Sequence, residues 1–399
     1  CGYDVPITPT LSSLATEPGA VSTCRAYAPG SWTLPSHASF FTGLGVLEHG
    51  AHEYAGSVDN PAGTAVVAHG LDKTHETLAE PMRSRGYQTV LLAGNPVVGK
   101  GMGLARGYQF AKSARRFGDL GHQELTRELR SVIRQKLDPL GGPIFLTVNL
   151  AEAHRPWIAV PREHALIRRR PSLQFDNQSA DADWVQYLGG TMEPREKRRF
   201  ISHISDVYDY GVERADDGVR AVLRVVREEG WCRDKCRIVI TSDHGEFIGE
   251  QGLIDHGFYS WEPNAQVFLL ALGTEVTAFP EPISALVAYS LVLDGKLPDP
   301  LPPVQHAAWP HMRRSIHTNG RAYASVSAAQ WVGWTKHLWM DGVVKSFDLK
   351  ADPWEIAAIP HDVPVDFSAF VERVRAASHV GKAGDADVLE ALKAAGYVE

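Results

Sequence analysis

Residues 237–246, RIVITSDHGE, join an apolar run to a group of polar side chains, and this junction decides the fold. The β-branched run at 237–241 predicts a buried strand. Asp243 and His244 follow it, and Gly245 lets the backbone turn away. A carboxylate beside an imidazole at a strand end suits a divalent cation. A capping Asp next to a structural His is the alternative interpretation.

The rest of the chain alternates strands with helices. Short apolar runs predict further strands at 88–93, 143–150 and 266–272. Helical spacing of apolar residues predicts helices at 77–86, 124–137 and 195–229. This order predicts an α/β fold with a doubly wound, mostly parallel sheet flanked by helices. Because such folds bind ligands beyond the carboxyl ends of their strands, the candidate site residues are Asn95, His154, Asp243 and His244.

A chain of 399 residues is expected to hold a large domain and a smaller one. The proline-rich segment 298–303 is interpreted as a linker between a catalytic domain, 1–300, and a small α+β subdomain, 301–399. The subdomain is predicted to contain strands at 322–326, 331–340 and 343–349 and a closing helix at 385–395. Segment 158–192 is charged and lacks periodicity, which indicates an insertion or a lid loop.

Composition limits the function classes. The net charge of −7 argues against a general nucleic-acid binder, and the basic clusters 168–170 and 195–199 are interpreted as solvated faces. No apolar stretch approaches the ~20 residues that span a bilayer. Cys232 and Cys236 are expected to be thiols, with a disulfide as the alternative in an oxidising compartment. The scarcity of cysteine favours a cytoplasmic location. Because the chain starts with Cys1 and not Met, an upstream segment is expected to be missing.

A second cluster lies at 24–43, CRAYAPGSWTLPSHASFFTG. Ser36 is a candidate N-cap, which would leave Thr33 just outside a helix N-terminus, where amide groups favour an oxyanion. A hydroxyl becomes a good nucleophile once a metal or a base lowers its pKa. A plain capped helix is the alternative. His154 and His256 also follow strands or short loops, where a histidine can bind a substrate oxygen or protonate a leaving group; structural histidines are the alternative.

These clusters, in this order, resemble the sulfatase family within the alkaline phosphatase superfamily. The resemblance rests on segments spread over nearly the whole chain: CGYDVPITPTLSSLA (1–15), TLPSHASFFTG (33–43), LEHGAH (47–52), LAEPMRSRGYQTVLLAGNP (78–96), NLAEAHRPW (149–157), YDYGVERADDGV (208–219), TSDHGEFIGEQGLIDHG (241–257), KSFDLKADPWE (345–355) and LKAAGYVE (392–399). It implies an alkaline phosphatase-like fold and a metal-dependent ester hydrolase.

The resemblance also implies roles for individual residues. Thr33 stands at the nucleophile position and His37 at the place of the motif's arginine. Asp243 and His244, together with Thr33, stand at metal-ligand positions, and His154 and His256 stand where the family contacts substrate. The family's acidic ligands belong to a first strand that would precede Cys1, so the chain is interpreted as truncated there.

Threonine cannot form the hydrated formylglycine of typical sulfatases, whereas phosphoester-cleaving relatives use a threonine. The resemblance therefore favours a phosphate ester over a sulfate ester. A true sulfuric ester hydrolase, a phosphoglycerol- or phosphoethanolamine-type transferase and an inactive binding homologue are the alternatives. The implied cofactor is a divalent ion, with Mn, Mg or Zn favoured over Ca because a histidine is among the ligands. The expected partner is a small-molecule, glycan or lipid-headgroup ester, with no nucleic acid.

Overall fold

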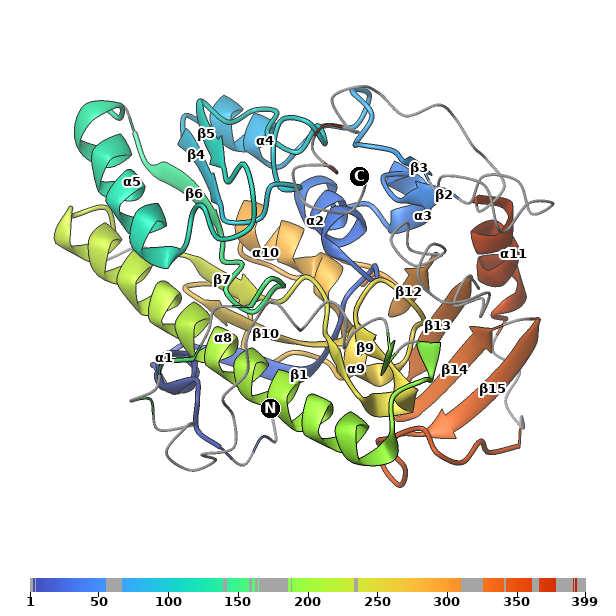
Figure 1. Cartoon of the computed structure of the whole chain (residues 1–399). Coiled ribbons are helices and arrows are strands. Elements are labelled where there is room, and N and C mark those ends of the chain that lie inside the picture. Colours follow the sequence, from blue (N-terminus) through green and yellow to red (C-terminus); the bar gives the residue numbers. More distant parts are fainter. Residues whose placement is uncertain are drawn as a thin grey trace.

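The computed structural model describes the chain at residues 3, 5–54, 67–138, 142–157, 160–161, 164, 186–187, 189–232, 236–309, 326–340, 342–360, 366–377, 390 and 392. Strands and helices alternate through the first three quarters of the chain, and a small antiparallel sheet follows (Figure 1). The fold class is therefore the predicted one.

Two blocks of strands form the centre of the molecule. One block is parallel, in the order β5-β4-β6, and comprises β4 (Gln88–Ala93), β5 (Phe110–Ser113) and β6 (Ile144–Asn149). The other has the order β11-β1-β10-β7 and comprises β1 (Val21–Tyr27), β7 (Ile238–Thr241), β10 (Gln266–Leu272) and β11 (Ile283–Ser284). Strand β10 runs antiparallel to both of its neighbours, so this block is mixed.

Helices cover both faces of the sheet, as alternation along β4 requires. Val90 and Leu92 point to one face and pack with α5 (His122–Gln135) and α8 (Pro194–Glu228). Leu91 and Ala93 point to the other face and share a core with α2 (Thr33–Thr42). Both faces of β4 are apolar because both are buried, which is what a doubly wound sheet demands.

The remaining elements of this region are short. The helices are α1 (Pro9–Leu14), α3 (Val46–His49), α4 (Ala79–Ser84), α9 (Glu262–Ala265) and α10 (Ala288–Leu293), with 3-10 turns η1 (Glu250–Gly252) and η2 (Ala285–Val287). The short strands pair as β2 (Glu53–Tyr54) with β3 (Val67–Ala68), and as β8 (Phe247–Ile248) with β9 (Ile254–Asp255).

The C-terminal part contains an antiparallel sheet of β12 (Gln305–Ala308), β13 (Ser327–Val332), β14 (Thr335–Met340) and β15 (Val343–Asp348), followed by α11 (Ser368–Ala377). The single strand predicted at 331–340 is wrong: Gly333, with φ 60°, turns the chain between β13 and β14. Sequence analysis missed α11. The strand predicted at 322–326 and the helix at 385–395 fall almost wholly outside the described residues.

Buried ion pairs and a stacked pair of aromatic rings join this sheet to the main domain. Lys336 of β14 is fully buried, and its Nζ lies 3.1 Å from Glu262 of α9 and 2.6 Å from Glu355. The ring of Tyr27 at the end of β1 stacks on Trp331 with centroids 4.1 Å apart. Such close packing makes residues after 300 part of one structure with the main domain, although the boundary at 300 stays a prediction.

Two other predictions concern the cysteine pair and the segment 158–192. The sulfurs of Cys232 and Cys236 form a disulfide, so the expected pair of thiols is wrong. Most of the predicted insertion at 158–192 lies outside the described residues. Within the part of the chain that is described, no helix is long and apolar enough to cross a membrane.

Candidate active site

The helix α2 places Thr33 at the centre of the site. The helix begins at Thr33 itself, with Trp32 as an extended N-cap residue, so the expected cap at Ser36 is wrong. Pro35 is tolerated inside the first turn because amide groups there have no intrahelical acceptor. The Ser36 hydroxyl instead donates to the carbonyl oxygen of Gly30 at 3.0 Å. Thr33 is therefore a fully buried residue of the first helical turn, not one outside it.

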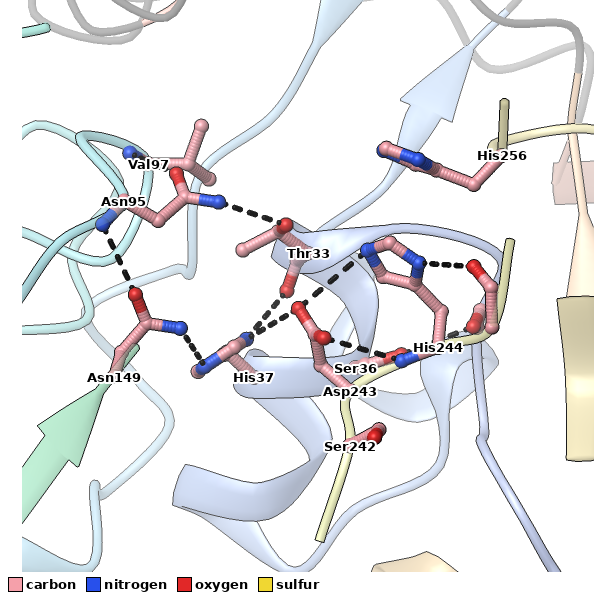
Figure 2. Close-up of polar contacts among 12 residues, drawn as sticks. Thr33, Ser36, His37, Asn95, Val97, Asn149, Ser242, Asp243, His244 and His256 are labelled. Carbon is pink, nitrogen blue, oxygen red and sulfur yellow. Dashed lines mark hydrogen bonds and ion pairs between the residues drawn. The ribbon is translucent and has the colours of Figure 1, made fainter. Parts of the chain in front are cut away.

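Two asparagines at strand ends tie Thr33 and α2 to the parallel block (Figure 2). Asn95, just after β4, donates from Nδ2 to the Thr33 Oγ1 at 3.0 Å. Its Oδ1 accepts from the Val97 amide at 2.9 Å, which orients the side chain. Asn149, the last residue of β6, accepts the Asn95 amide on Oδ1 at 3.0 Å. The strand-end rule pointed to Asn95, but sequence analysis assigned it no role and missed Asn149.

His37 connects α2 to the residues that follow β7. Its Nδ1 lies 3.0 Å from the Thr33 carbonyl oxygen and 3.4 Å from Asp243 Oδ2. Both partners are acceptors, so Nδ1 carries the proton and Nε2 accepts from Asn149 Nδ2 at 3.4 Å. Through these contacts His37 joins α2, which carries Thr33, to the Asp243 carboxylate.

Asp243 and His244 lie side by side, as the sequence predicts, with Asp243 Oδ2 3.6 Å from His244 Nε2. Burial opposes the Asp243 charge, but the imidazoles of His244 and His37 outweigh it and hold the pKa of this carboxyl below its ordinary value. Burial lowers the pKa of His244 to about 4, so its ring is neutral. Its Nδ1 donates to the Gly245 carbonyl oxygen at 2.8 Å, which leaves the lone pair on Nε2 facing Asp243.

His256 is a buried cation. Its Nδ1 lies 2.8 Å from Glu246 Oε2 and 3.0 Å from Asp255 Oδ1. Burial alone would lower the pKa of His256, but the two carboxylates outweigh it and raise this pKa to about 10. Its Nε2 is buried and has no hydrogen-bond partner among the described residues. Sequence analysis missed the roles of Glu246 and Asp255, although both lie beside a predicted histidine.

His154 lies close to His256, but its ring is neutral whereas that of His256 is charged. The ring centroids of the two histidines are 5.0 Å apart, and His154 stacks on Phe117 at 3.9 Å. Burial lowers the pKa of His154 to about 3, so its ring is neutral. Its Nδ1 donates to the Arg155 carbonyl oxygen, which leaves Nε2 as an acceptor. The structure thus brings together all six predicted site residues: Thr33, His37, His154, Asp243, His244 and His256.

Two sets of donors could hold a cation, and both include His244. One is the predicted set of Thr33, Asp243 and His244. In the other, His244, Glu246 and His256 have ligand atoms within 4.8 Å of one another. The second set fits less well because the Glu246 carboxylate already holds the imidazolium of His256, which would repel a metal ion.

A cavity of about 990 Å³ connects these residues to the interior of the sheet. The site residues at one end of it include Thr33, His37, Asn95, His154, Asp243 and His244. Apolar side chains of β6, β7 and α8 form part of the remaining wall. Thr33 therefore faces a partly open cavity with largely apolar walls, where polar interactions are stronger than in bulk water.

The fold is a doubly wound α/β fold whose strand ends carry a compact cluster of polar side chains. The Sulfatase family model matches residues 1–275, so the chain belongs to the sulfatase family. Among curated proteins, the Extracellular sulfatase SULF-1 homolog of Drosophila melanogaster is 26% identical over 182 residues. That alignment spans 45% of this chain and only 16% of the fly protein.

Solved structures agree on the fold. The phosphonate monoester hydrolase of Agrobacterium radiobacter superposes with a TM-score of 0.62 at 17% identity, covering 93% of this chain and 90% of that one. A structure solved with its substrate D-glucosamine-2-N,6-O-disulfate gives a TM-score of 0.63 at 14% identity, covering 97% and 92%. At such identities the likeness establishes the alkaline phosphatase-like fold alone.

Proposed function

We propose that this chain cleaves a phosphate ester through a covalent phospho-Thr33 intermediate. The observation that carries the proposal is the buried Thr33 hydroxyl, which receives a hydrogen bond from Asn95. The backbone carbonyl oxygen of Thr33 contacts His37, which in turn contacts Asp243. A threonine has a single hydroxyl, so it can form and release a phosphoester but cannot become the hydrated aldehyde on which typical sulfatases depend. The chemistry of the nucleophile therefore favours phosphate over sulfate.

The residues present fit a divalent ion. Asp243 is kept ionised, and His244 is neutral with its Nε2 lone pair free of the Gly245 contact. Thr33 lines the same cavity as these two residues. A carboxylate, an imidazole and a hydroxyl form a donor set that Mn²⁺, Mg²⁺ or Zn²⁺ accepts. Such an ion would lower the pKa of a hydroxyl and neutralise charge on a phosphoryl group. Three donors do not saturate an ion, so further ligands are expected.

In the first step of the reaction, each side chain has a separate role. Thr33 Oγ1, having lost its proton to solvent, forms a bond to phosphorus as the bond from phosphorus to the leaving oxygen breaks. The His256 imidazolium gives its Nε2 proton to that oxygen, which departs as an alcohol. Because Glu246 and Asp255 hold His256 protonated, this proton donor is charged at neutral pH. His154, whose Nδ1 proton is held by the Arg155 carbonyl oxygen, can act on substrate only as an acceptor through Nε2.

The second step reverses these roles. The neutral His256 removes a proton from water as the water oxygen attacks phosphorus and the bond from phosphorus to Thr33 Oγ1 breaks. Asn95 donates to the Thr33 oxygen as negative charge develops on it. The products are an alcohol and a phosphate, and Thr33 regains its proton from solvent.

Parallel assays with p-nitrophenyl phosphate, bis-p-nitrophenyl phosphate and p-nitrophenyl sulfate test the proposal. We expect turnover of a phosphate substrate and its loss in Thr33→Ala. A Ser36→Ala variant is the matched control, because Ser36 lies on the same helix and its hydroxyl donates to the Gly30 carbonyl oxygen. Turnover of the sulfate alone would contradict the phosphate preference.

A true sulfuric ester hydrolase is the second candidate, because the chain belongs to the sulfatase family and is similar to a named extracellular sulfatase. The same assays decide between the two. A transferase would differ in its product, so adding glycerol to the phosphate assay and finding phosphoglycerol in place of inorganic phosphate would identify it. If full-length, metal-loaded protein turns over none of these substrates, the binding-homologue alternative is favoured.

A further inference from the structure

The chain that follows β15 exposes a run of apolar side chains. Residues 353–360 read PWEIAAIP, and all of them except Glu355 are exposed. Trp354 is 61% exposed and Ile356 is 81% exposed, which is the largest fraction among the exposed large hydrophobic residues of the described chain. In Figure 1 the chain turns back after β15 and runs along the edge of the C-terminal sheet toward α11. Residues 353–360 are called the apolar loop below. Contiguous exposed apolar surface often marks a binding site.

The single polar side chain of the apolar loop is turned into the protein. Glu355 has a positive φ of 56°, a backbone conformation that most residues avoid. Its buried carboxylate lies 2.6 Å from the Nζ of Lys336. Because the residues on either side of Glu355 are exposed, the loop presents Trp354 and Ile356 to the surroundings from an anchored base.

The backbone of the apolar loop forms its hydrogen bonds inside the protein. The carboxylate of Asp352, which precedes the loop, accepts the Ala357 amide at 2.8 Å. It also bonds to the amides of Ile356, Trp354 and Glu355. Ile359 donates its amide to the Ser346 carbonyl oxygen at 2.8 Å, and the two prolines have no amide. A backbone whose donors have partners loses little when water is removed, so this loop can enter an apolar medium.

The exposed area is too small for a stable protein partner. A wholly exposed aromatic side chain offers at most about 250 Å², and an isoleucine offers less. At exposed fractions of 61%, 81% and 38%, Trp354, Ile356 and Ile359 together offer at most about 450 Å². A stable protein interface needs about 800 Å² from each partner. A bilayer surface needs less, because tryptophan and aliphatic side chains insert there individually.

Two lysines flank the apolar loop. Lys345 lies on β15 beside the bridge to Ile359, and Lys350 lies in the turn after β15; both are exposed. Among the described residues no carboxylate forms an ion pair with either side chain. The nearby Asp348 and Asp352 accept backbone amides instead. A lysine beside an apolar surface extends its ammonium group to the headgroups of a bilayer, where anionic lipids attract it.

We propose that the apolar loop docks this protein on the surface of a phospholipid bilayer that contains anionic lipids. Trp354 and Ile356 insert between the lipids, and Lys345 and Lys350 lie at the level of the headgroups. The loop carries its own backbone acceptor in Asp352, so it enters the interface without unfolding. Docking is a property of the loop and holds whichever ester the site cleaves.

The position of the apolar loop places the active site near the bilayer. Gln251 donates from Nε2 to the Trp354 carbonyl oxygen at 3.0 Å. It lies in η1, between the paired strands β8 and β9. The same hairpin brings Glu246 and Asp255 to His256. A docked molecule therefore holds this wall of the site close to esters that lie at the lipid surface.

Vesicle sedimentation tests the proposal. We expect the protein to sediment with vesicles made of equal parts of phosphatidylcholine and phosphatidylglycerol, and less with phosphatidylcholine alone. The double substitution Trp354→Ser with Ile356→Ser should weaken binding to the mixed vesicles at least about tenfold, and Lys350→Gln should weaken it about fivefold. Val343→Ser is the matched control, because Val343 is 55% exposed but lies at the opposite end of β15 from the start of the loop.

Hydrolysis of p-nitrophenyl phosphate without vesicles, measured in parallel, separates docking from the proposed function, since neither result depends on the other. Failure of the unchanged protein to sediment with the mixed vesicles would overturn the proposal, and so would equal binding by the double variant and the control. A concentration-dependent dimer of the unchanged protein, seen by analytical ultracentrifugation and lost in the double variant, would assign the loop to a second copy and also overturn it.

A fluorescent label reports the insertion itself. An environment-sensitive nitrobenzoxadiazole group attached at Ile356→Cys is expected to shift its emission to the blue when mixed vesicles are added, and to be quenched by brominated phospholipid. The same label at Val343→Cys is expected to do neither. If the labelled protein sediments with vesicles but the emission at Ile356→Cys does not change, another surface binds the bilayer and the proposal is overturned.

Discussion

Replacing Asn95 by Ala removes the hydrogen bond on the Thr33 oxygen. The Nδ2–Oγ1 distance is 3.0 Å, and both residues are buried, so water does not replace the donor. A hydrogen bond to a charged group contributes about 1.5–3 kcal/mol. The Thr33 oxygen carries most charge when it leaves phosphorus, so the variant should slow the breakdown of the phosphoenzyme by roughly 10- to 150-fold.

The assay is a rapid acid quench with p-nitrophenyl phosphate, in which kcat and the fraction of phosphorylated enzyme are measured together. We expect kcat to fall while phosphoenzyme accumulates. Asn95 also accepts the Val97 amide, so the free energy of unfolding is measured in urea to account for the loss of this turn contact. An unchanged kcat, or a phosphoenzyme level that falls in proportion to kcat, would refute the assigned role.

Three further predictions concern buried charge and the ion. Glu53 is fully buried, and burial raises its pKa well above the ordinary value, so the folded state keeps a proton that the unfolded state loses as pH rises above about 4.5. The free energy of unfolding should therefore fall by up to about 1.4 kcal/mol per pH unit above that point until the pKa of the folded state is reached. Urea unfolding at several pH values should show a flatter pH profile in Glu53→Gln, with the exposed Glu372→Gln as the control. The same slope in the original protein and in Glu53→Gln would contradict this prediction. Lys336→Met should lower the free energy of unfolding, measured in urea, by about 3–5 kcal/mol, because it leaves two carboxylates buried without their cation. A loss below about 1 kcal/mol would show that this ion-pair cluster does not stabilise the C-terminal sheet against the main domain. Chelation by EDTA should abolish phosphate-ester turnover and added Mn²⁺, Mg²⁺ or Zn²⁺ should restore it, whereas activity that persists in metal-free protein would contradict a metal site at Asp243.

Local sequence patterns were sufficient for the elements that have one strong signal. Strands β4 and β10 begin and end where their apolar runs do, and α8 follows its helical periodicity from Pro194 to Glu228. The start of α2 was misplaced because Ser36 was interpreted as its N-cap, whereas the helix begins at Thr33. Pro35 fits inside the first turn because the amide that a proline lacks has no intrahelical acceptor there. The break between β13 and β14 depended on Gly333, whose positive φ no apolar pattern reveals.

In the site, too, features set by the local sequence could be predicted, whereas contacts between residues far apart in the sequence could not. Asp243, His244 and His154 could be predicted because each follows a strand, and parallel strand ends gather at one edge of a sheet. The contact between Asn95 and Thr33 joins residues 62 positions apart, and the charge on His256 depends on how β8 and β9 bring Glu246 to its ring. Such features follow from tertiary packing, which periodicity and composition do not encode.

Trapping the covalent intermediate tests the central claim most directly. The protein, loaded with a divalent ion, is mixed with p-nitrophenyl phosphate, quenched in acid and digested, and its peptides are analysed by mass spectrometry. The account predicts one added phosphoryl group on Thr33, absent from Thr33→Ala and retained in Ser36→Ala. A phosphoryl group on another residue, or phosphate-ester turnover at the original rate in Thr33→Ala, would contradict the account.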